Sequence, residues 1–130
     1  MMVQPLIEIK NLSISFGSGE QKVQAVNNLS YSVPRGKTVG VVGESGSGKS
    51  LTSLAIMGLL NPAATINSGE IHFHHSSSPV SLLKLSDKEM RQYRGNEIAM
   101  IFQEPMTSLN PVIKCGEQVS EALRLHKSLS

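Results

Sequence analysis

The sequence has no Trp, a single Cys and no long run of apolar residues. One Cys excludes an internal disulfide, which fits a reducing compartment such as the cytosol. The longest apolar-rich run, residues 51–60, is about half of what a membrane-crossing helix needs, and residues 1–5 lack the features of a secretion signal. A net charge of +2 over 130 residues does not argue for nucleic acid or an anionic membrane surface as a partner. These absences predict one soluble domain with no membrane-spanning segment of its own and no nucleic acid partner.

A phosphate-binding pattern is the most informative stretch of the chain. Residues 43–50 read GESGSGKS and match G-x-x-x-x-G-K-[ST] at every fixed position. An apolar run at 38–42 precedes them and a helix-forming run at 51–60 follows. A phosphate-binding loop has to join a buried strand to a helix N-terminus, and these two flanks supply both. The alternative, a Gly/Ser-rich turn that contains a Lys by chance, explains neither flank.

The residue types of this loop suit the phosphates of a nucleotide. Glycines allow backbone angles closed to other residues, so that successive N–H groups can surround phosphate oxygens, and the helix N-terminus adds further N–H groups. Lys49 is predicted to bind the β- and γ-phosphates, and Ser50 to offer its hydroxyl to Mg²⁺. The side chains of Glu44 and Ser45 are expected to point outward. The predicted nucleotide-binding residues of the loop are Gly43, Glu44, Ser45, Gly46, Ser47, Gly48, Lys49, Ser50 and Leu51.

The rest of the chain is expected to form an antiparallel sheet and several short helices. Alternating apolar residues predict two paired strands at 6–16 and 23–33, with a bulge where the alternation slips at Asn11. Continuous apolar runs predict fully buried strands at 38–42 and 98–102. The other expected elements are strands at 69–75 and 80–83, a helix at 51–60 that is buried nearly all round and stopped by Asn61-Pro62, a short helix opened by a capping box at 86–89, and an amphipathic helix from Glu117.

The metal-binding residues of an NTPase are incomplete in this sequence. Phosphoryl transfer needs a second group on the metal, usually an Asp at the end of an apolar strand. The only Asp, Asp87, lies in a helix cap, and capping accounts for it. Gln103 and Glu104 follow the apolar run at 98–102. Two interpretations stay open: these two residues form a degenerate metal site, or the strand that bears the Asp lies beyond residue 130.

Three histidines in one predicted strand raise a second metal hypothesis. His72 and His74 would point to one face of the strand and His75 to the other. Since no carboxylate or Cys accompanies them, we expect an exposed strand edge and not a metal site.

Three stretches together resemble a known family. They are SISF at 13–16, GESGSGKS at 43–50, and IAMIFQEPMTSLNPV at 98–112 with the GEQVSEALRLHK that follows. With them the chain is similar to the N-terminal part of the ATP-binding subunit of ABC transporters, within the uptake systems for dipeptides, oligopeptides, nickel and glutathione. The resemblance implies an α/β fold, the P-loop NTPase core of ABC type. An antiparallel β region would occupy 1–36, the core with an inserted β/helix segment 37–102, and the start of the helical subdomain 103–130.

The resemblance also implies ligands, partners and further site residues. ATP and Mg²⁺ would be the ligands, with Lys49 and Gln103 catalytic, and with Ser50 and Gln103 on the Mg²⁺. Phe16 would stack on adenine, although a Phe in the core or at an edge explains its position equally. The loop 104–111 and the helix after it would face transmembrane permease subunits, and a second ATP-binding subunit would complete the site. The protein would be cytoplasmic and peripheral on the inner face of the cell membrane.

Several motifs of the resembled family are absent from the 130 residues. They are the LSGGQ signature, the Walker B Asp with its following Glu, and the switch His. We therefore expect an N-terminal piece that binds nucleotide weakly and does not hydrolyse it efficiently alone, so whether this chain is an enzyme stays open. The alternatives are a non-catalytic nucleotide-binding module, a small-molecule kinase, and a non-transport ABC ATPase acting on DNA or the ribosome. No arginine cluster or basic face supports the last two, and no Asn-Lys-x-Asp pattern supports a GTPase.

Overall fold

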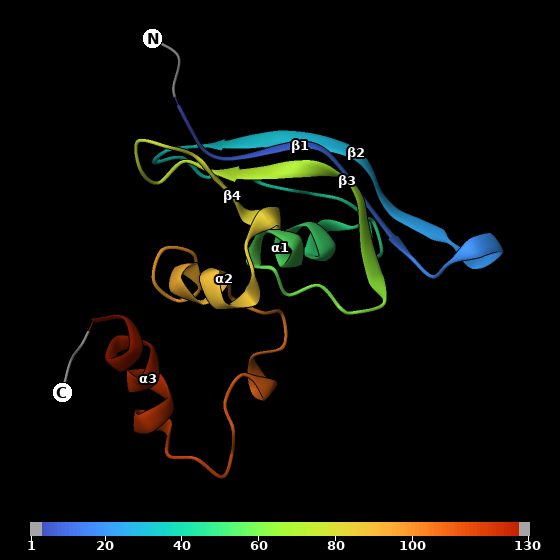
Figure 1. Cartoon of the computed structure of the whole chain (residues 1–130). Coiled ribbons are helices and arrows are strands. Elements are labelled where there is room, and N and C mark those ends of the chain that lie inside the picture. Colours follow the sequence, from blue (N-terminus) through green and yellow to red (C-terminus); the bar gives the residue numbers. More distant parts are fainter. Residues whose placement is uncertain (1–3, 128–130) are drawn as a thin grey trace. The chain divides into compact units, whose positions relative to one another are not determined.

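The chain separates into two units on either side of the Leu85–Ser86 bond. The computed structural model describes residues 4–127 (Figure 1). Within these residues the first unit contains an antiparallel sheet and one α-helix, and the second contains two α-helices. This boundary falls inside the region 37–102 that the sequence assigns to a phosphate-loop core.

A four-stranded antiparallel sheet is the framework of the first unit. Its strand order is β2-β1-β3-β4, so that β1 (Pro5–Phe16) lies between β2 (Val23–Pro34) and β3 (Ala64–Phe73), as Figure 1 shows. The short β4 (Val80–Ser81) pairs with the end of β3, and the 3-10 turn η1 (Gly19–Gln21) connects β1 to β2. The predicted antiparallel pairing of the first two strands is confirmed. The third strand begins earlier than the predicted residue 69 and ends before 75.

The core of this unit lies on one face of β1 and β3. The pairing of β1 with β2 shifts register between Ile9 and Leu12, both of which are buried. This shift confirms the bulge predicted at Asn11, and it keeps the apolar side chains on the core face although their spacing changes. The core residues of the two strands are Ile9, Leu12, Ile14, Ile71 and Phe73.

The two predicted buried strands at 38–42 and 98–102 are wrong. Neither run forms a strand, and Val42 is 93% exposed and Ile101 98% exposed. A strand is stable only when its N–H and C=O groups pair with neighbouring strands. Within residues 4–127 the second run makes only an isolated bridge between Arg94 and Ile98, and the first pairs with no strand.

Helix α1 (Lys49–Met57) follows the phosphate-binding pattern. It ends at Gly58, whose φ of 63° places it in the left-handed region and whose N–H donates to the Ala55 carbonyl at 3.1 Å. The prediction that Asn61-Pro62 stops this helix is therefore wrong. The predicted burial on nearly every side is wrong as well, because only Thr52, Ala55 and Met57 of the helix are buried. The helix packs against η2 (Leu82–Lys84), the 3-10 turn after β4.

The second unit contains the helices α2 (Asp87–Tyr93) and α3 (Cys115–Lys127) and the 3-10 turn η3 (Pro105–Thr107). The predicted capping box of α2 is confirmed, since Ser86 Oγ accepts from the Glu89 N–H and the Glu89 carboxylate accepts from the Ser86 N–H. Helix α3 begins at Cys115, earlier than predicted, and has no buried residue. No helix within residues 4–127 has both the length and the apolar character that a membrane crossing requires.

Candidate functional site

The predicted phosphate loop turns back on itself before it enters α1. Gly46 and Gly48 have φ angles of 80° and 86°, and the Ser47 N–H donates to the Glu44 carbonyl at 3.2 Å. The N–H of Thr52 donates to the Gly48 carbonyl at 3.0 Å, so the helix begins as the loop ends. Glycine adopts left-handed backbone angles without steric strain because it has no Cβ. The loop is therefore curled at these two glycines before the helix begins.

A close contact with β2 fixes the end of the loop against the sheet. A Cβ added to Gly48 would lie 2.8 Å from the Ala25 carbonyl oxygen and 2.8 Å from Val26 Cγ2. Val26 pairs with Ile14 of β1, and Phe16 lies further along the same strand. The missing side chain of Gly48 thus lets the loop pack beside the end of the β1–β2 pair, where the half-buried Phe16 lies.

The side chain of Lys49 reaches back over the loop. Its Nζ donates to the carbonyl oxygens of Gly43 and Glu44, both at 2.6 Å, and to Ser47 Oγ at 3.2 Å. The ammonium therefore lies among loop oxygens beside the N-terminus of α1. A positive charge and a helix N-terminus at one place favour an anion there.

The other predicted site residues of the first unit surround this arrangement. Ser50 is exposed in the first turn of α1, and Leu51 is half-buried. Glu44 and Ser45 are exposed, which agrees with side chains that point to solvent. Hydrogen bonds bring together Gly43, Glu44, Ser47 and Lys49. The pattern did not reveal the hydroxyl of Ser47 as a partner of the ammonium.

Gln103 belongs to the second unit, in an exposed bend before η3. The neighbouring Glu104 is exposed too, and its carbonyl accepts from the Thr107 hydroxyl at 3.1 Å. The role of Gln103 at a metal ion stays a prediction.

His72 of β3 and His74, which follows the strand, each have a carboxylate partner. The expectation that no carboxylate accompanies these histidines is therefore wrong. His72 Nε2 lies 2.9 Å from Glu70 Oε2, and His74 Nε2 lies 3.6 Å from Glu8 Oε2. Glu8 lies opposite His72 in the register of β1 and β3. This register brings Glu8 close to His74, two residues after His72, from a distant part of the sequence. No group of three or more His, Cys, Asp or Glu in the described part of the chain could hold a metal ion.

The expected exposed strand edge at these histidines is also wrong. β3 pairs with β1 on one side and with β4 on the other, and His72 itself pairs with Ser81. Lys10 is the main reason that the pKa of Glu8 lies below its usual value, and His74 contributes to the same shift. In the same way His72 lowers the pKa of Glu70. Two of the ion pairs, Lys10–Glu8 and His72–Glu70, each lie within one strand, and His74–Glu8 joins β1 to the residue after β3.

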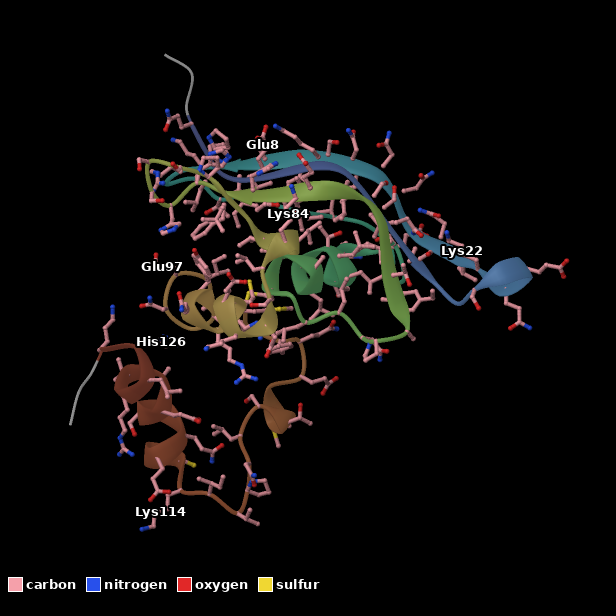
Figure 2. The ribbon with its side chains drawn as sticks, in the orientation of Figure 1. Glu8, Lys22, Lys84, Glu97, Lys114 and His126 are labelled. Atoms are coloured by element: carbon pink, nitrogen blue, oxygen red, sulfur yellow. The ribbon has the colours of Figure 1, made fainter. Side chains whose placement is uncertain are left out.

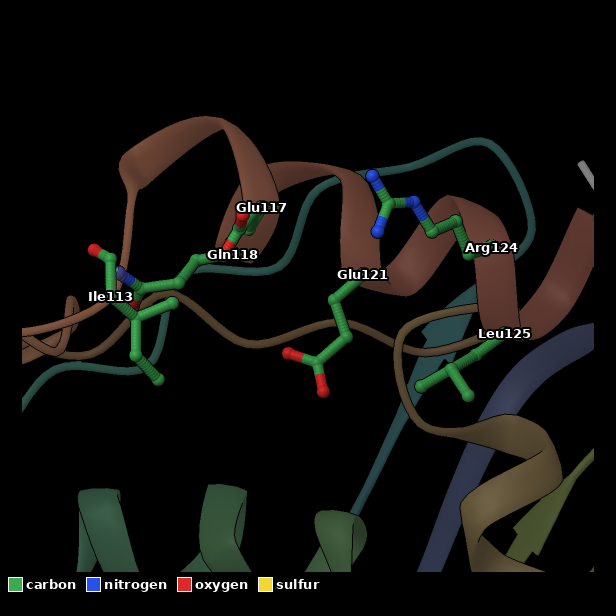
Figure 3. Close-up of a pocket in the computed structure, with 6 residues that line it drawn as sticks. All are labelled: Ile113, Glu117, Gln118, Glu121, Arg124 and Leu125. Carbon is green, nitrogen blue, oxygen red and sulfur yellow. The ribbon is translucent and has the colours of Figure 1, made fainter. Parts of the chain in front are cut away.

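A groove of about 350 Å³ lies along α3. The side chains of Ile113, Glu121 and Leu125 point to the same side in Figure 3, whereas Arg124 points away. Gln118 fixes the turn before the helix, because its amide donates to the carbonyls of Asn110 and Ile113 at 2.9 and 2.8 Å. The groove combines apolar ends with carboxylates, and its lining residues are Ile113, Glu117, Gln118, Glu121, Arg124 and Leu125.

Comparison with known proteins defines the class. The family described as ABC transporter matches residues 26–129, and the chain belongs to this family. It is 47% identical over 127 residues to the glutathione import ATP-binding protein GsiA of Shigella flexneri serotype 5b (strain 8401), and equally to that of Escherichia coli O157:H7. It is 48% identical over 126 residues to GsiA of Pectobacterium atrosepticum. These alignments cover 95–96% of this chain and 20% of each relative, so the chain spans about a fifth of the length of the curated relatives it matches.

Solved structures agree with this assignment. The dimeric bacterial ABC transporter cassette MJ0796 matches with a TM-score of 0.76 and 27% identity, over 92% of this chain and 47% of that one. A dimeric post-hydrolysis state of the same cassette, bound to ADP and Pi, matches with a TM-score of 0.72 and 24% identity over the same shares. The predicted fold class, an ABC-type P-loop ATPase with an N-terminal antiparallel β region, is confirmed.

Proposed function

We propose that this chain is the nucleotide-binding N-terminal part of the energy-coupling subunit of an ABC importer. The observation that carries the proposal is the Lys49 ammonium, held by the carbonyls of Gly43 and Glu44 and by Ser47 Oγ at the start of α1. Nearly half of the residues are identical in proteins named for glutathione import. That name supports a small peptide-like solute, such as glutathione, for the complete transporter.

ATP and Mg²⁺ are the proposed ligands of this site. The main-chain N–H groups of the loop 43–51 would bind the triphosphate, and Lys49 would neutralise its β- and γ-phosphates. Ser50 of the first unit is the proposed contact to Mg²⁺, and a role of Gln103 at the metal and the attacking water is proposed from the family resemblance alone. Phe16 would stack on the adenine, because the loop packs against the end of the sheet that carries Phe16.

The proposed partners are membrane permease subunits and a second ATP-binding subunit. The loop at 104–111 and the groove on α3 would form the surface that a permease contacts at the cytoplasmic face of the membrane. Val119 and Leu123 of α3, which do not line this groove, are 69% and 50% exposed, and exposed apolar side chains are typical of an interaction surface. Dimeric relatives with the same fold support pairing with a second ATP-binding subunit.

Hydrolysis would need residues that these 130 do not contain. The LSGGQ signature, the Walker B Asp and Glu and the switch His are absent from the sequence. We therefore propose that the chain binds ATP and that hydrolysis requires the rest of a cassette.

A non-catalytic nucleotide-binding module is the second candidate. Asp87, the only Asp of the chain, forms ion pairs with Arg91 and Arg94, both at 2.8 Å, so its contacts are those of a structural residue of α2. A phosphate-release assay on the purified chain separates the two candidates from an autonomous ATPase, because both predict no turnover above background.

Titration of the purified chain with ATP and Mg²⁺ tests nucleotide binding. Lys49→Ala should weaken binding by about tenfold or more, the loss expected when an ionic hydrogen bond to phosphate disappears. Lys37→Ala is the matched control, since Lys37 is exposed in the turn before the apolar run at 38–42. Equal affinities for the wild-type chain and Lys49→Ala would contradict the proposed site.

A further inference from the structure

Ser47 is the loop residue whose side chain the phosphate-binding pattern leaves unexplained, because the pattern uses only its main chain. In the structure its hydroxyl oxygen lies 3.2 Å from Lys49 Nζ and accepts a hydrogen bond from it. The same hydroxyl occupies the space beside Gly43. A Cβ on Gly43 would lie 2.6 Å from Ser47 Oγ and 3.7 Å from Lys49 Nζ. The Ser47 hydroxyl, the ammonium and the Gly43 backbone therefore share one small volume.

The three acceptors of the ammonium differ in kind. Two are main-chain carbonyls, of Gly43 and Glu44, and these are present whatever the side chains are. The third is the Ser47 hydroxyl, the one side-chain oxygen that Lys49 Nζ contacts in the described part of the chain. The Ser47 N–H also donates to the Glu44 carbonyl at 3.2 Å, so this residue fixes one of the other two acceptors as well.

Such a contact has a consequence for binding. A free Lys side chain samples many rotamers, and binding a phosphate would then cost the entropy of ordering it. An ammonium that loop oxygens already hold has lost most of that freedom before the ligand arrives.

We propose that Ser47 is a positioning residue, whose hydroxyl holds the Lys49 ammonium over the loop so that its charge is in place for a triphosphate. This inference rests on the proposed nucleotide binding by the same loop. Because Ser47 would act through Lys49, its effect should depend on the ammonium. It should also be larger for ATP than for AMP, which lacks the β- and γ-phosphates that Lys49 would contact.

A double-mutant cycle on the full 130-residue chain tests the inference. The affinities for ATP and AMP are measured for the wild-type chain, Ser47→Ala, Lys49→Ala and the double variant. We expect Ser47→Ala to weaken ATP binding about three- to tenfold, because an ammonium that is less ordered in the free chain must be ordered when ATP binds, with AMP binding changed less than about twofold. In the Lys49→Ala background the same substitution should have no further effect, and Ser47→Thr, which keeps the hydroxyl, should retain most of the affinity for ATP.

Ser53→Ala is the matched control. It removes a hydroxyl that also bonds to Lys49, but at the main-chain carbonyl and at 3.4 Å, away from the ammonium. Unchanged thermal unfolding of Ser47→Ala shows that the fold is intact.

Two kinds of failure are distinguishable. If Lys49→Ala weakens ATP binding and Ser47→Ala does not, or if Ser47→Ala weakens ATP and AMP equally or in both backgrounds, the positioning role is overturned and the nucleotide site stands. If the wild-type chain does not bind ATP, or Lys49→Ala binds it unchanged, both proposals are overturned.

Discussion

The main-chain N–H of Asn11 donates a hydrogen bond to Ser30 Oγ, 2.8 Å away across the β1–β2 pair. The relationship is reciprocal, because the N–H of Asn28 donates to Ser13 Oγ at 2.9 Å. Both Asn residues have positive φ, 49° and 48°, a conformation that Asn tolerates better than most residues. Two Asn-Leu-Ser tripeptides, 11–13 and 28–30, thus face each other and close the irregular part of the strand pair.

The first prediction concerns these two serines. Ser13 is 8% exposed and Ser30 is exposed, so water replaces the lost acceptor more easily at Ser30. Ser13→Ala should lower the free energy of unfolding by about 1–2 kcal/mol and Ser30→Ala by about 0.5–1 kcal/mol. Urea denaturation measures both, with Ser32→Ala, exposed on the same strand, as the control. A larger loss at Ser30 than at Ser13 would contradict this account.

The second prediction separates two glycines of the phosphate loop. Both have positive φ, but a Cβ on Gly48 would meet Ala25 and Val26, whereas a Cβ on Gly46 would meet nothing within 4 Å. Gly46→Ala should therefore cost only backbone strain, about 1–2 kcal/mol, and Gly48→Ala clearly more, since it adds a steric clash with the sheet. Thermal unfolding compares them, with Gly40→Ala as a control at an open position without positive φ. Equal losses would show that Gly48 does not pack against β2.

The third prediction concerns acid. Lys10 and His74 hold the pKa of Glu8 below its ordinary value of 4.5, and Figure 2 shows Glu8 among the side chains of the sheet. A carboxyl whose pKa is lower in the folded state stabilises the fold above the unfolded-state pKa, and this stability is lost as the pH falls through the folded-state pKa. The free energy of unfolding should therefore decrease as the pH drops below about 4.5.

Denaturation curves of the wild-type chain and Glu8→Gln between pH 3 and 7 measure this effect. The variant should be less stable than the wild type near neutral pH and should lose less stability on acidification. Glu20→Gln, on the exposed turn η1, is the control. Parallel pH profiles for the wild type and Glu8→Gln would remove Glu8 as a source of acid sensitivity.

Local patterns predicted the β1–β2 pair and the N-cap of α2 because their causes are close in sequence. The alternation in 6–16 and 23–33 revealed the β1–β2 pair and its bulge, and Ser86 and Glu89 revealed the start of α2. Both features depend on residues joined by a short connection or by one helical turn.

Local sequence patterns did not predict the features that depend on residues far apart in the chain. The contact of Gly48 with Val26 and the pairing of Glu8 with His74 follow from how the sheet folds, and no local pattern encodes them. The apolar run at 38–42 has the composition of a buried strand, but a parallel strand exists only beside its neighbours. The composition of this run therefore favours a buried strand, but it does not decide whether neighbouring strands are present to form one.

The fourth prediction follows from the exposure of the apolar runs at 38–42 and 98–102. Val42 and Ile101 are almost fully exposed, and exposed apolar segments of high β-propensity promote association. Val42→Lys and Ile101→Lys should each raise the solubility of the purified chain and lower its binding of an apolar dye. Thr38→Lys, at an exposed polar position beside the first run, adds the same charge without removing an apolar side chain. An equal gain from Thr38→Lys would assign the effect to charge alone.

The exposed apolar residues at 38–42 and 98–102 are also relevant to the turnover of this protein in a cell. Quality-control chaperones and proteases act on chains that display such segments. The abundance of the protein should therefore depend on what covers these two runs after synthesis, and a well-formed phosphate loop alone would not protect it from turnover.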